Sequence, residues 1–394
     1  MRPRPFSSEA AMLFLNNADV LQVLTMADCV RVHEEGEVEL AIGELAARPR
    51  FDTIVTTPSP EHYYRWGTVE AASKSLQTQA IRLKSDVIYY EGSGDSLVEE
   101  KYAGKPGLYC GLVMLFDTSN GSPLAIIQDG NLQQARVGAK NALGVKYLAR
   151  ENAKTVGMLG SGGQARSHLE AFATVRPIER CNVYSPTKAN RERYASEMRE
   201  KLGIEVIAVN SADEAVDGAD IISCNTNAMT PILFPEMVKP GVHITVVSGE
   251  WDRAVPRMVD VVPSSAESRL FHGAAPDFSL GRGGAAAVYA AASDSDLRHL
   301  VEISGNRYGE VAARQRGGGD TPRRTRSVPL AALIQGTAQG RLHDNEISSS
   351  SGVGGGGTAG MSFVVVGKLI YDLARERGLG TEIPTDLFLQ DVRN

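Results

Sequence analysis

A glycine-rich stretch between residues 155 and 165 carries the clearest chemical signal in this sequence. It reads Thr155-Val-Gly-Met-Leu-Gly-Ser-Gly-Gly-Gln-Ala165, so that an apolar run leads into the spacing GxGxxA. The first glycine permits a tight turn, the second lets backbone approach a phosphate, and the alanine lets a helix pack closely on the strand. Free N–H groups at the start of that helix attract an anion. The stretch predicts a turn that binds a dinucleotide pyrophosphate, formed by Gly160, Ser161, Gly162, Gly163, Gln164 and Ala165.

The segments that follow predict the sheet that this turn needs. Apolar runs near residues 181–185, 219–224 and 243–248 are typical of buried strands, and helical patterns over 188–201 and 212–216 separate them. Strands that alternate with helices favour a parallel sheet covered on both faces. We therefore expect an α/β protein with a Rossmann-type doubly wound parallel sheet.

Two loops of this sheet contain further candidate cofactor residues. The second strand ends at Tyr184 without the acidic residue that usually binds the ribose of NAD. Polar and basic residues stand there instead, which favours NADP over NAD. Ligands of such sheets bind at the carboxyl ends of the strands, and the loop after Cys224 lies at such an end. The candidate cofactor residues in these two loops are Ser185, Thr187, Lys188, Arg191, Asn225, Thr226 and Asn227.

Composition excludes several other classes of protein. The net charge is −6, and the one basic cluster, at residues 323–326, lies beside glycines and proline, so we expect no nucleic-acid partner. No apolar run has the length of a membrane helix or a signal peptide. The four cysteines lack a CxxC pair and the histidines are scattered, so we expect reduced thiols, a cytoplasmic protein and no metal site.

The regions on either side of the nucleotide-binding segment predict a second unit. We expect a helix over residues 18–47, strands near 54–57, 80–84 and 111–116, a hairpin to 124–127, and a helix over 133–150. Towards the end of the chain we expect mobile loops at 281–284 and 317–320, a helix over 288–303, a flexible linker at 348–357, and a last helix over 362–378.

Several of these segments resemble the ornithine cyclodeaminase/mu-crystallin family. The resemblance rests on residues 114–127, on Asp129-Gly-Asn-Leu-Gln-Gln-Ala-Arg136, on the glycine-rich turn and on residues 240–244. It covers about 20–250 and 360–385. It implies a Rossmann domain at 141–339, with a divergent insertion at about 263–330. It also implies a second α+β domain for substrate binding and dimerisation, formed from both chain ends at 1–140 and 340–394, in a homodimer or higher homo-oligomer.

The resemblance also implies a reaction. Members of the family exchange a hydride between a nicotinamide cofactor and a carbon–nitrogen bond. We therefore expect an NAD(P)-dependent oxidoreductase of an amino acid, imine or ketimine. The alternatives are a cyclodeaminase-like lyase, which releases ammonia and recycles its cofactor internally, and a crystallin-type protein that binds NADPH.

Basic side chains of the second domain hold the substrate carboxylate in this family. The matching position after Asp129-Gly is Arg136, whose guanidinium can form two charge-assisted hydrogen bonds to a carboxylate. Arg50 resembles the first family arginine, with Arg48 as the alternative. The family lysine falls on Arg82 or Lys84, which face the same side of a strand. We assign Arg50, Arg82 and Arg136 to substrate binding and Lys84 to catalysis.

A carboxylate near residue 250 is the remaining candidate for chemistry. The cyclodeaminases place a catalytic aspartate after the strand that here ends near Ser248. Counting from the strand selects Glu250, whereas counting back from Asp260 selects Asp252. Either carboxylate can serve proton transfer at an amine if it lies within hydrogen-bond reach. The intervening Trp251 either lines a pocket or packs beneath the loop.

Overall fold

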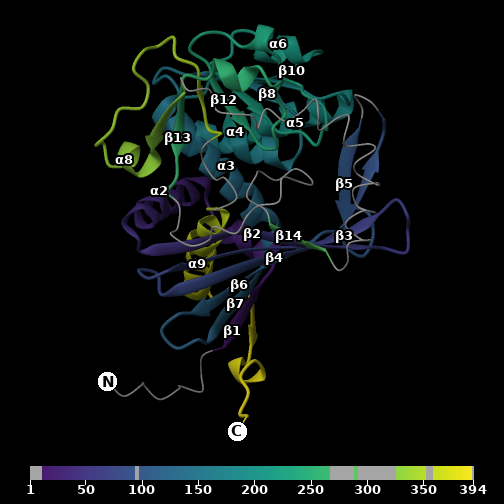
Figure 1. The fold of residues 1–394 in the computed structure, drawn as a ribbon, viewed down its shortest axis with the longest axis vertical. Helices are drawn as coiled ribbons and strands as arrows, with labels where there is room; N and C mark the ends of the chain where they lie inside the picture. Colours follow the sequence, from purple (N-terminus) through teal and green to yellow (C-terminus); the bar gives the residue numbers. More distant parts are fainter. Residues whose placement is uncertain (1–10, 94–96, 267–287, 292–324, 352–357, 393–394) are drawn as a thin grey trace.

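The computed structural model describes residues 11–93, 97–266, 288–291, 325–351 and 358–392. Two sheets dominate these residues, one above the other in Figure 1, and a long helix, α3 (Asp129–Leu148), leads from one sheet to the other. No described helix is long and apolar enough to cross a membrane.

The lower sheet contains nine of the described strands. Its order is β14-β2-β3-β4-β6-β7-β1-β17, and β5 pairs with the last part of β4. Most neighbours are antiparallel, while β14 and β1 pair in parallel with β2 and β7. The strands are β1 (Met12–Leu15), β2 (Leu45–Thr56), β3 (Tyr63–Ser73), β4 (Thr78–Glu91), β5 (Val98–Tyr102), β6 (Cys110–Asp117), β7 (Pro123–Gln128), β14 (Val288–Ala291) and β17 (Thr381–Ile383).

The upper sheet confirms the doubly wound α/β prediction. Its eight described strands follow the order β10-β9-β8-β11-β12-β16-β13-β15, and every pair is parallel. The order runs outward in both directions from β8, as expected when helices cover both faces. The strands are β8 (Thr155–Leu159), β9 (Arg180–Tyr184), β10 (Glu205–Ala208), β11 (Ile221–Cys224), β12 (His243–Val246), β13 (Val261–Ser264), β15 (Arg326–Pro329) and β16 (Ser348–Ser349).

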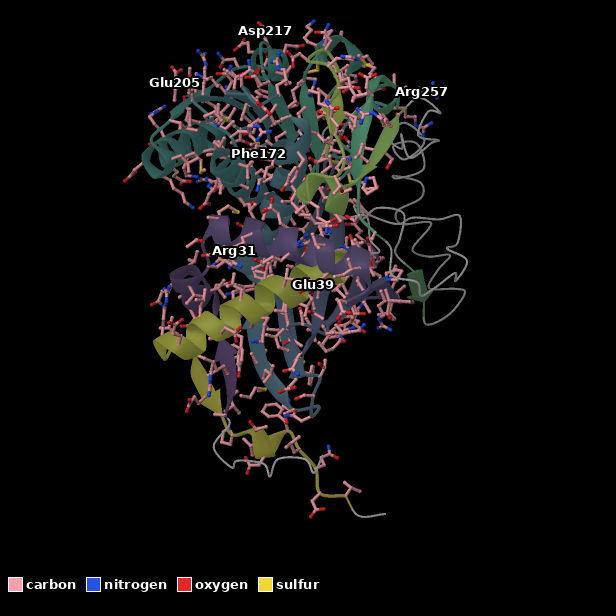
Figure 2. The ribbon with its side chains drawn as sticks, turned by 90° about the vertical axis from the view of Figure 1, so that its left-hand side faces the viewer. Arg31, Glu39, Phe172, Glu205, Asp217 and Arg257 are labelled. Atoms are coloured by element: carbon pink, nitrogen blue, oxygen red, sulfur yellow. The ribbon has the colours of Figure 1, made fainter. Side chains whose placement is uncertain are left out.

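Helices from both chain ends pack on the lower sheet. Figure 2 shows α2 (Met26–Ile42), marked by Arg31 and Glu39, above α9 (Ala359–Arg377). Glycines on α9 allow close contact, since Gly360 lies against the backbone of Glu70 and Gly367 against Leu115. The other helices are α1 (Asn17–Val23), α4 (Gly163–Val175), α5 (Lys188–Leu202), α6 (Ala212–Val216), α8 (Leu330–Ile334), and the short 3-10 turns η2 (Pro235–Met237), η3 (Val255–Met258) and η4 (Thr385–Leu387).

The single helix expected over residues 18–47 is wrong. The chain forms α1 and α2 with a break at Leu24 and Thr25, because the Thr25 hydroxyl accepts the Asp28 N–H and caps a new helix. Gly43, with φ of 78°, ends α2. Residues from Leu45 onward then belong to β2.

The helix expected over residues 288–303 fails at its start. Val288–Ala291 is strand β14 rather than the start of a helix, because it extends the lower sheet by pairing with β2. Residues 292–303, and the loops expected at 281–284 and 317–320, lie outside the described residues.

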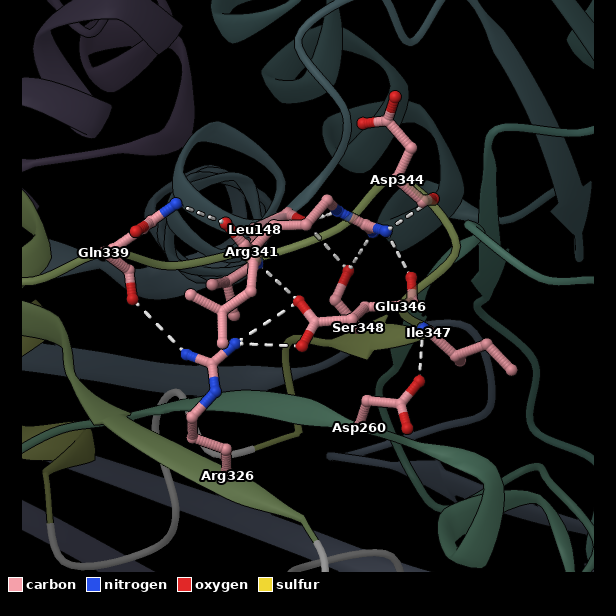
Figure 3. Close-up of polar contacts among 10 residues, drawn as sticks. Leu148, Asp260, Arg326, Gln339, Arg341, Asp344, Glu346, Ile347 and Ser348 are labelled. Atoms are coloured by element: carbon pink, nitrogen blue, oxygen red, sulfur yellow. Dashed lines mark hydrogen bonds and ion pairs between the residues drawn. The ribbon is translucent and has the colours of Figure 1, made fainter.

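The linker expected at 348–357 begins instead with a buried strand. Ser348 and Ser349 form β16 in the upper sheet. We expected residues 340–394 in the substrate-binding domain, which contains the lower sheet. Figure 3 shows contacts that satisfy the buried Ser348: Arg341 donates to the Ser348 hydroxyl at 2.8 Å, and that hydroxyl donates to the Leu148 carbonyl at 2.9 Å. Composition alone missed this strand because its partner Leu148 lies far away in the sequence. Residues 352–357 lie outside the described residues.

Candidate active site

A cleft of about 1600 Å³ follows the carboxyl ends of β8, β9 and β11. This is the edge at which ligands of open parallel sheets bind. Its walls come from the glycine-rich turn, from the start of α5, from the loop after β11, and from Asp252 and Arg253. The described cleft therefore joins most of the cofactor residues that the sequence predicts.

The glycine-rich turn has the geometry that its sequence indicates. Gly160 has φ of 109°, and a side chain there would overlap the Asn225 carbonyl oxygen. Gly162 has open space around it and lines the cleft. Ala165 is fully buried under the β8–α4 packing. The buried Gln164 Oε1 has no protein partner among the described residues. A dinucleotide pyrophosphate fits this cradle, because α4 begins here and offers free N–H groups.

Four residues after β9 were expected to select the cofactor, and two of them line the described cleft. Ser185 and Thr187 line the cleft, and the Ser161 hydroxyl donates to that of Ser185 at 2.9 Å. The Lys188 ammonium is exposed and lies 3.7 Å from Glu192. The Arg191 guanidinium is buried and donates to the Ser185 carbonyl at 3.1 Å, so it supports the loop from behind.

Sequence reasoning missed two other residues at this end of the cleft. Asn190 and Arg193 line it together with Thr187. Thr187, Asn190 and Arg193 are three residues apart, so they lie on one side of the first turns of α5. A helical wheel that starts at Thr187 would have predicted this. Arg193 donates to the Asn190 side chain at 3.1 Å. Arg193 therefore brings a positive charge to this end of the cleft, whereas the charge of Arg191 lies behind the loop.

The loop after β11 connects the two sheets. Asn225, Thr226 and Asn227 all line the cleft. The Asn227 amide donates to Glu100 on β5 at 2.8 Å, and the Met229 N–H donates to the Leu97 carbonyl at 3.0 Å. Because β5 belongs to the lower sheet, one wall of the cofactor cleft is held in place by the other unit.

The two candidate carboxylates occupy different environments. Asp252 lines the cleft, and its carboxylate accepts the Ala254 N–H at 2.8 Å. Glu250 is buried, and its carboxylate accepts the N–H groups of Ser248 at 2.7 Å and Thr226 at 3.2 Å. Between them, Trp251 packs in a hydrophobic core beneath the loop. Backbone donors hold Glu250 in place, whereas Asp252 faces the cleft.

A group of cations lies on the α9 side of the lower sheet. The guanidinium groups of Arg82 and Arg136 lie 5.3 and 5.0 Å from the centre of the Phe363 ring at the start of α9. Arg82 donates to Asp129 at 2.8 and 2.6 Å, and Arg136 donates to the Gln133 side chain at 3.1 and 3.0 Å. Burial, followed by the charge of Arg82, lowers the pKa of Arg136 to about 9. A carboxylate placed beside Arg136 would relieve this repulsion.

Glycines in the facing strands make room for these charges. Arg50 donates to Asp52 at 2.7 Å, and a side chain at Gly67 would approach Asp52 to 2.5 Å. A side chain at Gly111 would overlap the Asp129 carboxylate. The alternative residue, Arg48, pairs with Glu70 at an exposed position. The geometry therefore favours Arg50 over Arg48 as a member of the cation group.

Lys84 lies two residues beyond Arg82 on the same face. Its ammonium is 2.8 Å from Asp86. Burial, reinforced by Lys101, holds the pKa of Lys84 well below its usual value, although Asp86 acts in the opposite direction. A lysine with a lowered pKa is suited to proton transfer near neutral pH.

The cation group does not line the cleft, but α3 connects the two. Gln134, two residues before Arg136, touches the glycine-rich turn so closely that a side chain at Gly163 would approach its amide to 2.6 Å. Arg136 lies on the same helix but points to a different side of it from Gln134. No three His, Cys, Asp or Glu side chains of the described residues are arranged to hold a metal ion.

The family model for "Ornithine cyclodeaminase/mu-crystallin family" matches residues 12–255, which is more than half of the chain. The chain belongs to this family. A Delta(1)-pyrroline-2-carboxylate reductase of Bacillus cereus is 32% identical over 285 residues, covering 72% of this chain and 77% of the relative. Ketimine reductase mu-crystallin of Rattus norvegicus is 36% identical over 191 residues, covering 48% and 56%.

Two solved structures share the fold. Thermococcus litoralis Delta(1)-pyrroline-2-carboxylate reductase, in complex with NADH and L-proline, aligns with a TM-score of 0.68 at 24% identity, covering 94% of this chain and all of the other (100%). The iminosuccinate reductase of Paracoccus denitrificans, in complex with NAD+, aligns with a TM-score of 0.65 at 20% identity and covers 95% of this chain and 99% of the other. At these identities the likeness shows the fold alone.

Proposed function

We propose that this protein reduces the C=N bond of an imine or ketimine that carries a carboxylate, with NADPH as the hydride donor. The protein is an NAD(P)-dependent oxidoreductase that acts at a carbon–nitrogen bond, as its relatives named pyrroline-2-carboxylate reductase and ketimine reductase indicate. The observation that supports the substrate class is the pair of cations beside Phe363, the buried Arg82 and the half-buried Arg136, on strand β4 and on helix α3, which also contacts the glycine-rich turn.

The substrate carboxylate binds Arg136, with Arg82 and Arg50 beside it, in this proposal. Arg136 donates to the neutral Gln133 side chain, which a ligand can replace, whereas Arg82 and Arg50 already pair with aspartates. A guanidinium fork holds a carboxylate in a fixed plane. Fixing the carboxylate orients the adjacent C=N carbon.

Proton transfer to the nitrogen is the second task of the protein. The bound cofactor supplies the hydride, so the residues need only orient the carbon and deliver a proton. We assign the proton to Asp252, which lines the cleft, with Lys84 as the alternative donor. Glu250, which the sequence also offers as a catalytic group, would hold the loops after β11 and β12 together.

The preference for NADP over NAD rests on the residues at the α5 end of the cleft. Ser185, Thr187, Asn190 and Arg193 offer hydroxyl, amide and guanidinium donors there, and no acidic residue of the described chain lines this end. A 2′-phosphate needs such donors, whereas the free ribose hydroxyls of NAD favour a carboxylate.

A homodimer built on the lower sheet completes the proposal. On the sheet face opposite α9, half-buried apolar side chains gather: Trp66, Leu83, Leu112, Met114 and Ile126. An apolar face of this kind suits a second copy of the chain. Light scattering of the wild type and of Trp66→Asp tests this, because the charged variant should shift towards monomer. We also propose a cytoplasmic location, since all four cysteines are free thiols.

Mass spectrometry of reaction products tests the activity. The purified protein is given cyclic imine carboxylates, or keto acids with simple amines, together with NADPH or NADH. Loss of reduced-cofactor absorbance matched by formation of the amine supports the proposal. Amino acids with the oxidised cofactors form the second arm. Ammonia release without net cofactor change would replace the proposal by a cyclodeaminase, and tight NADPH binding without turnover would leave a crystallin-type binding protein.

A further inference from the structure

An apolar wall lies beside Asp252 in the cofactor cleft. Ile232, Phe234 and Val247 all line the cleft, and none of the three has a role in the proposed function. Phe234 is 39% exposed and Val247 is 36% exposed, although both side chains are large and apolar. Exposed apolar side chains in a cleft mark a surface that a ligand covers. The wall therefore points to a ligand group that is itself apolar.

Two short segments run side by side at this wall. The Ile232 N–H donates to the Glu250 carbonyl at 2.7 Å, and the Asp252 N–H donates to the Leu233 carbonyl at 2.8 Å. These bonds pair Leu233 with Trp251 as in a parallel sheet. Both of these side chains are buried in the same hydrophobic core. The pairing therefore fixes which side of the two segments faces the core.

Phe234 and Asp252 are the next residues of the two segments. The Phe234 backbone is extended, with φ of −116° and ψ of 159°. Because side chains alternate along an extended chain, Phe234 and Asp252 point away from the core and toward the cleft, which both of them line. Neighbouring extended chains lie about 5 Å apart. A ligand group that contacts the Asp252 carboxylate therefore reaches the Phe234 ring.

The wall divides between cofactor and substrate. Val247 directly follows β12, and its N–H donates to the carbonyl of Cys224 at the end of β11 at 3.2 Å. A dinucleotide lies along such strand ends, so Val247 belongs to the cofactor part of the cleft. Ile232 and Phe234 lie instead on the segment that runs beside Asp252, the residue to which we assign the proton. These two side chains are therefore placed to contact the substrate.

We propose that Ile232 and Phe234 form an apolar subsite for the substrate, and that the substrate carries a branched aliphatic or aromatic group next to its C=N bond. The inference rests on the proposed function, in which the imine nitrogen takes the proton of Asp252. The imine carbon gains the hydride, and one NADPH is oxidised for each amine formed. A charged group against these two side chains would lose hydration without gaining a partner, whereas an apolar group gains from burial.

Three keto acids, each with methylamine and NADPH, test the subsite in turnover. 4-Methyl-2-oxopentanoate ends in an isopropyl group, oxaloacetate ends in a carboxylate of similar shape, and pyruvate has only a methyl group. We expect kcat/KM for the imine of 4-methyl-2-oxopentanoate to exceed the other two values about tenfold or more, because its isopropyl group is buried in the subsite. Equal values for all three imines, or a preference for oxaloacetate, would overturn the inference.

Single substitutions locate the subsite. Phe234→Ala and Ile232→Ala should each lower the preference for 4-methyl-2-oxopentanoate over pyruvate about tenfold and leave the Kd for NADPH unchanged. Phe388→Ala is the matched control, because Phe388 is 40% exposed and lies outside the described cleft lining. An equal loss of NADPH affinity would assign the wall to the nicotinamide and refute the inference. Melting curves confirm folding, and the wild-type series stands if a variant fails to fold.

Binding without turnover distinguishes this inference from the proposed function. Calorimetry with the NADPH-saturated protein compares L-leucine, L-alanine and L-aspartate, which cannot react because the cofactor is already reduced. We expect L-leucine to bind about tenfold or more tightly than the other two. If the wild type reduces no imine, the proposed function fails, while this series still judges the subsite. If it reduces imines but neither series favours the isopropyl group, the subsite fails and the proposed function remains.

Discussion

The cofactor cleft and the cation group differ in how the chain builds them. The cleft takes its essential turn from eleven consecutive residues between Thr155 and Ala165, in which Gly162 leaves open space. The cation group takes its members from β2, β4 and α3, and α9 adds the Phe363 ring. Arg82 is buried, Arg50 and Arg136 are half-buried, and Arg50 and Arg82 pair with aspartates. A backbone site for a common cofactor can be encoded locally, whereas a site for one particular substrate is assembled from distant segments.

The largest effect should follow removal of the carboxylate ligand. Arg136→Gln takes away a half-buried guanidinium that the proposal assigns to the substrate, and we expect kcat/KM to fall by about 10²–10³, corresponding to about 3–4 kcal/mol. Steady-state kinetics measure this, and NADPH titration of the same variant should give an unchanged Kd. An equal loss of NADPH affinity would mean that Arg136 supports the cleft instead.

The next effect tests the cleft itself. Gly160→Ala places a side chain at φ of 109° and against the Asn225 carbonyl. We expect NADPH binding to weaken by more than about tenfold, with a loss of stability of about 1–3 kcal/mol from the strained backbone. Fluorescence titration measures the NADPH affinity, and denaturant unfolding measures the stability. Gly203→Ala, at an αL helix end with open space and away from the cleft, is the control for strain alone.

The two carboxylates after β12 should behave differently. Asp252→Asn removes the group that faces the cleft, and we expect kcat to fall by about 10²-fold with little change in melting temperature. Glu250→Gln keeps one acceptor oxygen but sets an amide donor against one of the two backbone N–H groups, so we expect a lower melting temperature and a higher KM for NADPH. The reverse pattern, with kcat lost only in Glu250→Gln, would return the proton-transfer role to Glu250.

The smallest effect concerns the choice of cofactor. Arg193→Ala should raise the KM for NADPH by about tenfold and leave that for NADH nearly unchanged, because one charge-assisted contact to the 2′-phosphate is lost. Lys188→Ala, at an exposed position outside the described cleft lining, should change neither value. A larger effect of Lys188→Ala than of Arg193→Ala would mean that the α5 end closes differently around the cofactor.

Sequence reasoning succeeded where a feature depends on adjacent residues. Gly160 and Ala165 gave the turn, and the alternation of apolar runs gave the parallel sheet, because both follow from local spacing. It failed where neighbours in space decide the outcome. Ser348 and Ser349 resemble a linker by composition, yet they form a strand of the upper sheet, where His243 and Arg341 hydrogen-bond to the Ser348 hydroxyl.

The sequence by itself determined that the chain binds a dinucleotide on a doubly wound sheet, and its family resemblance predicted Arg136 as the ligand of a substrate carboxylate. Only the tertiary structure decided which polar residues face the cleft. It turned Arg191 inward and brought Arg193 to the wall. It also placed Asp252 in the cleft and Glu250 behind it. The reason is physical: residue type and spacing fix what a side chain can do, but its surroundings fix whether it is free to do it.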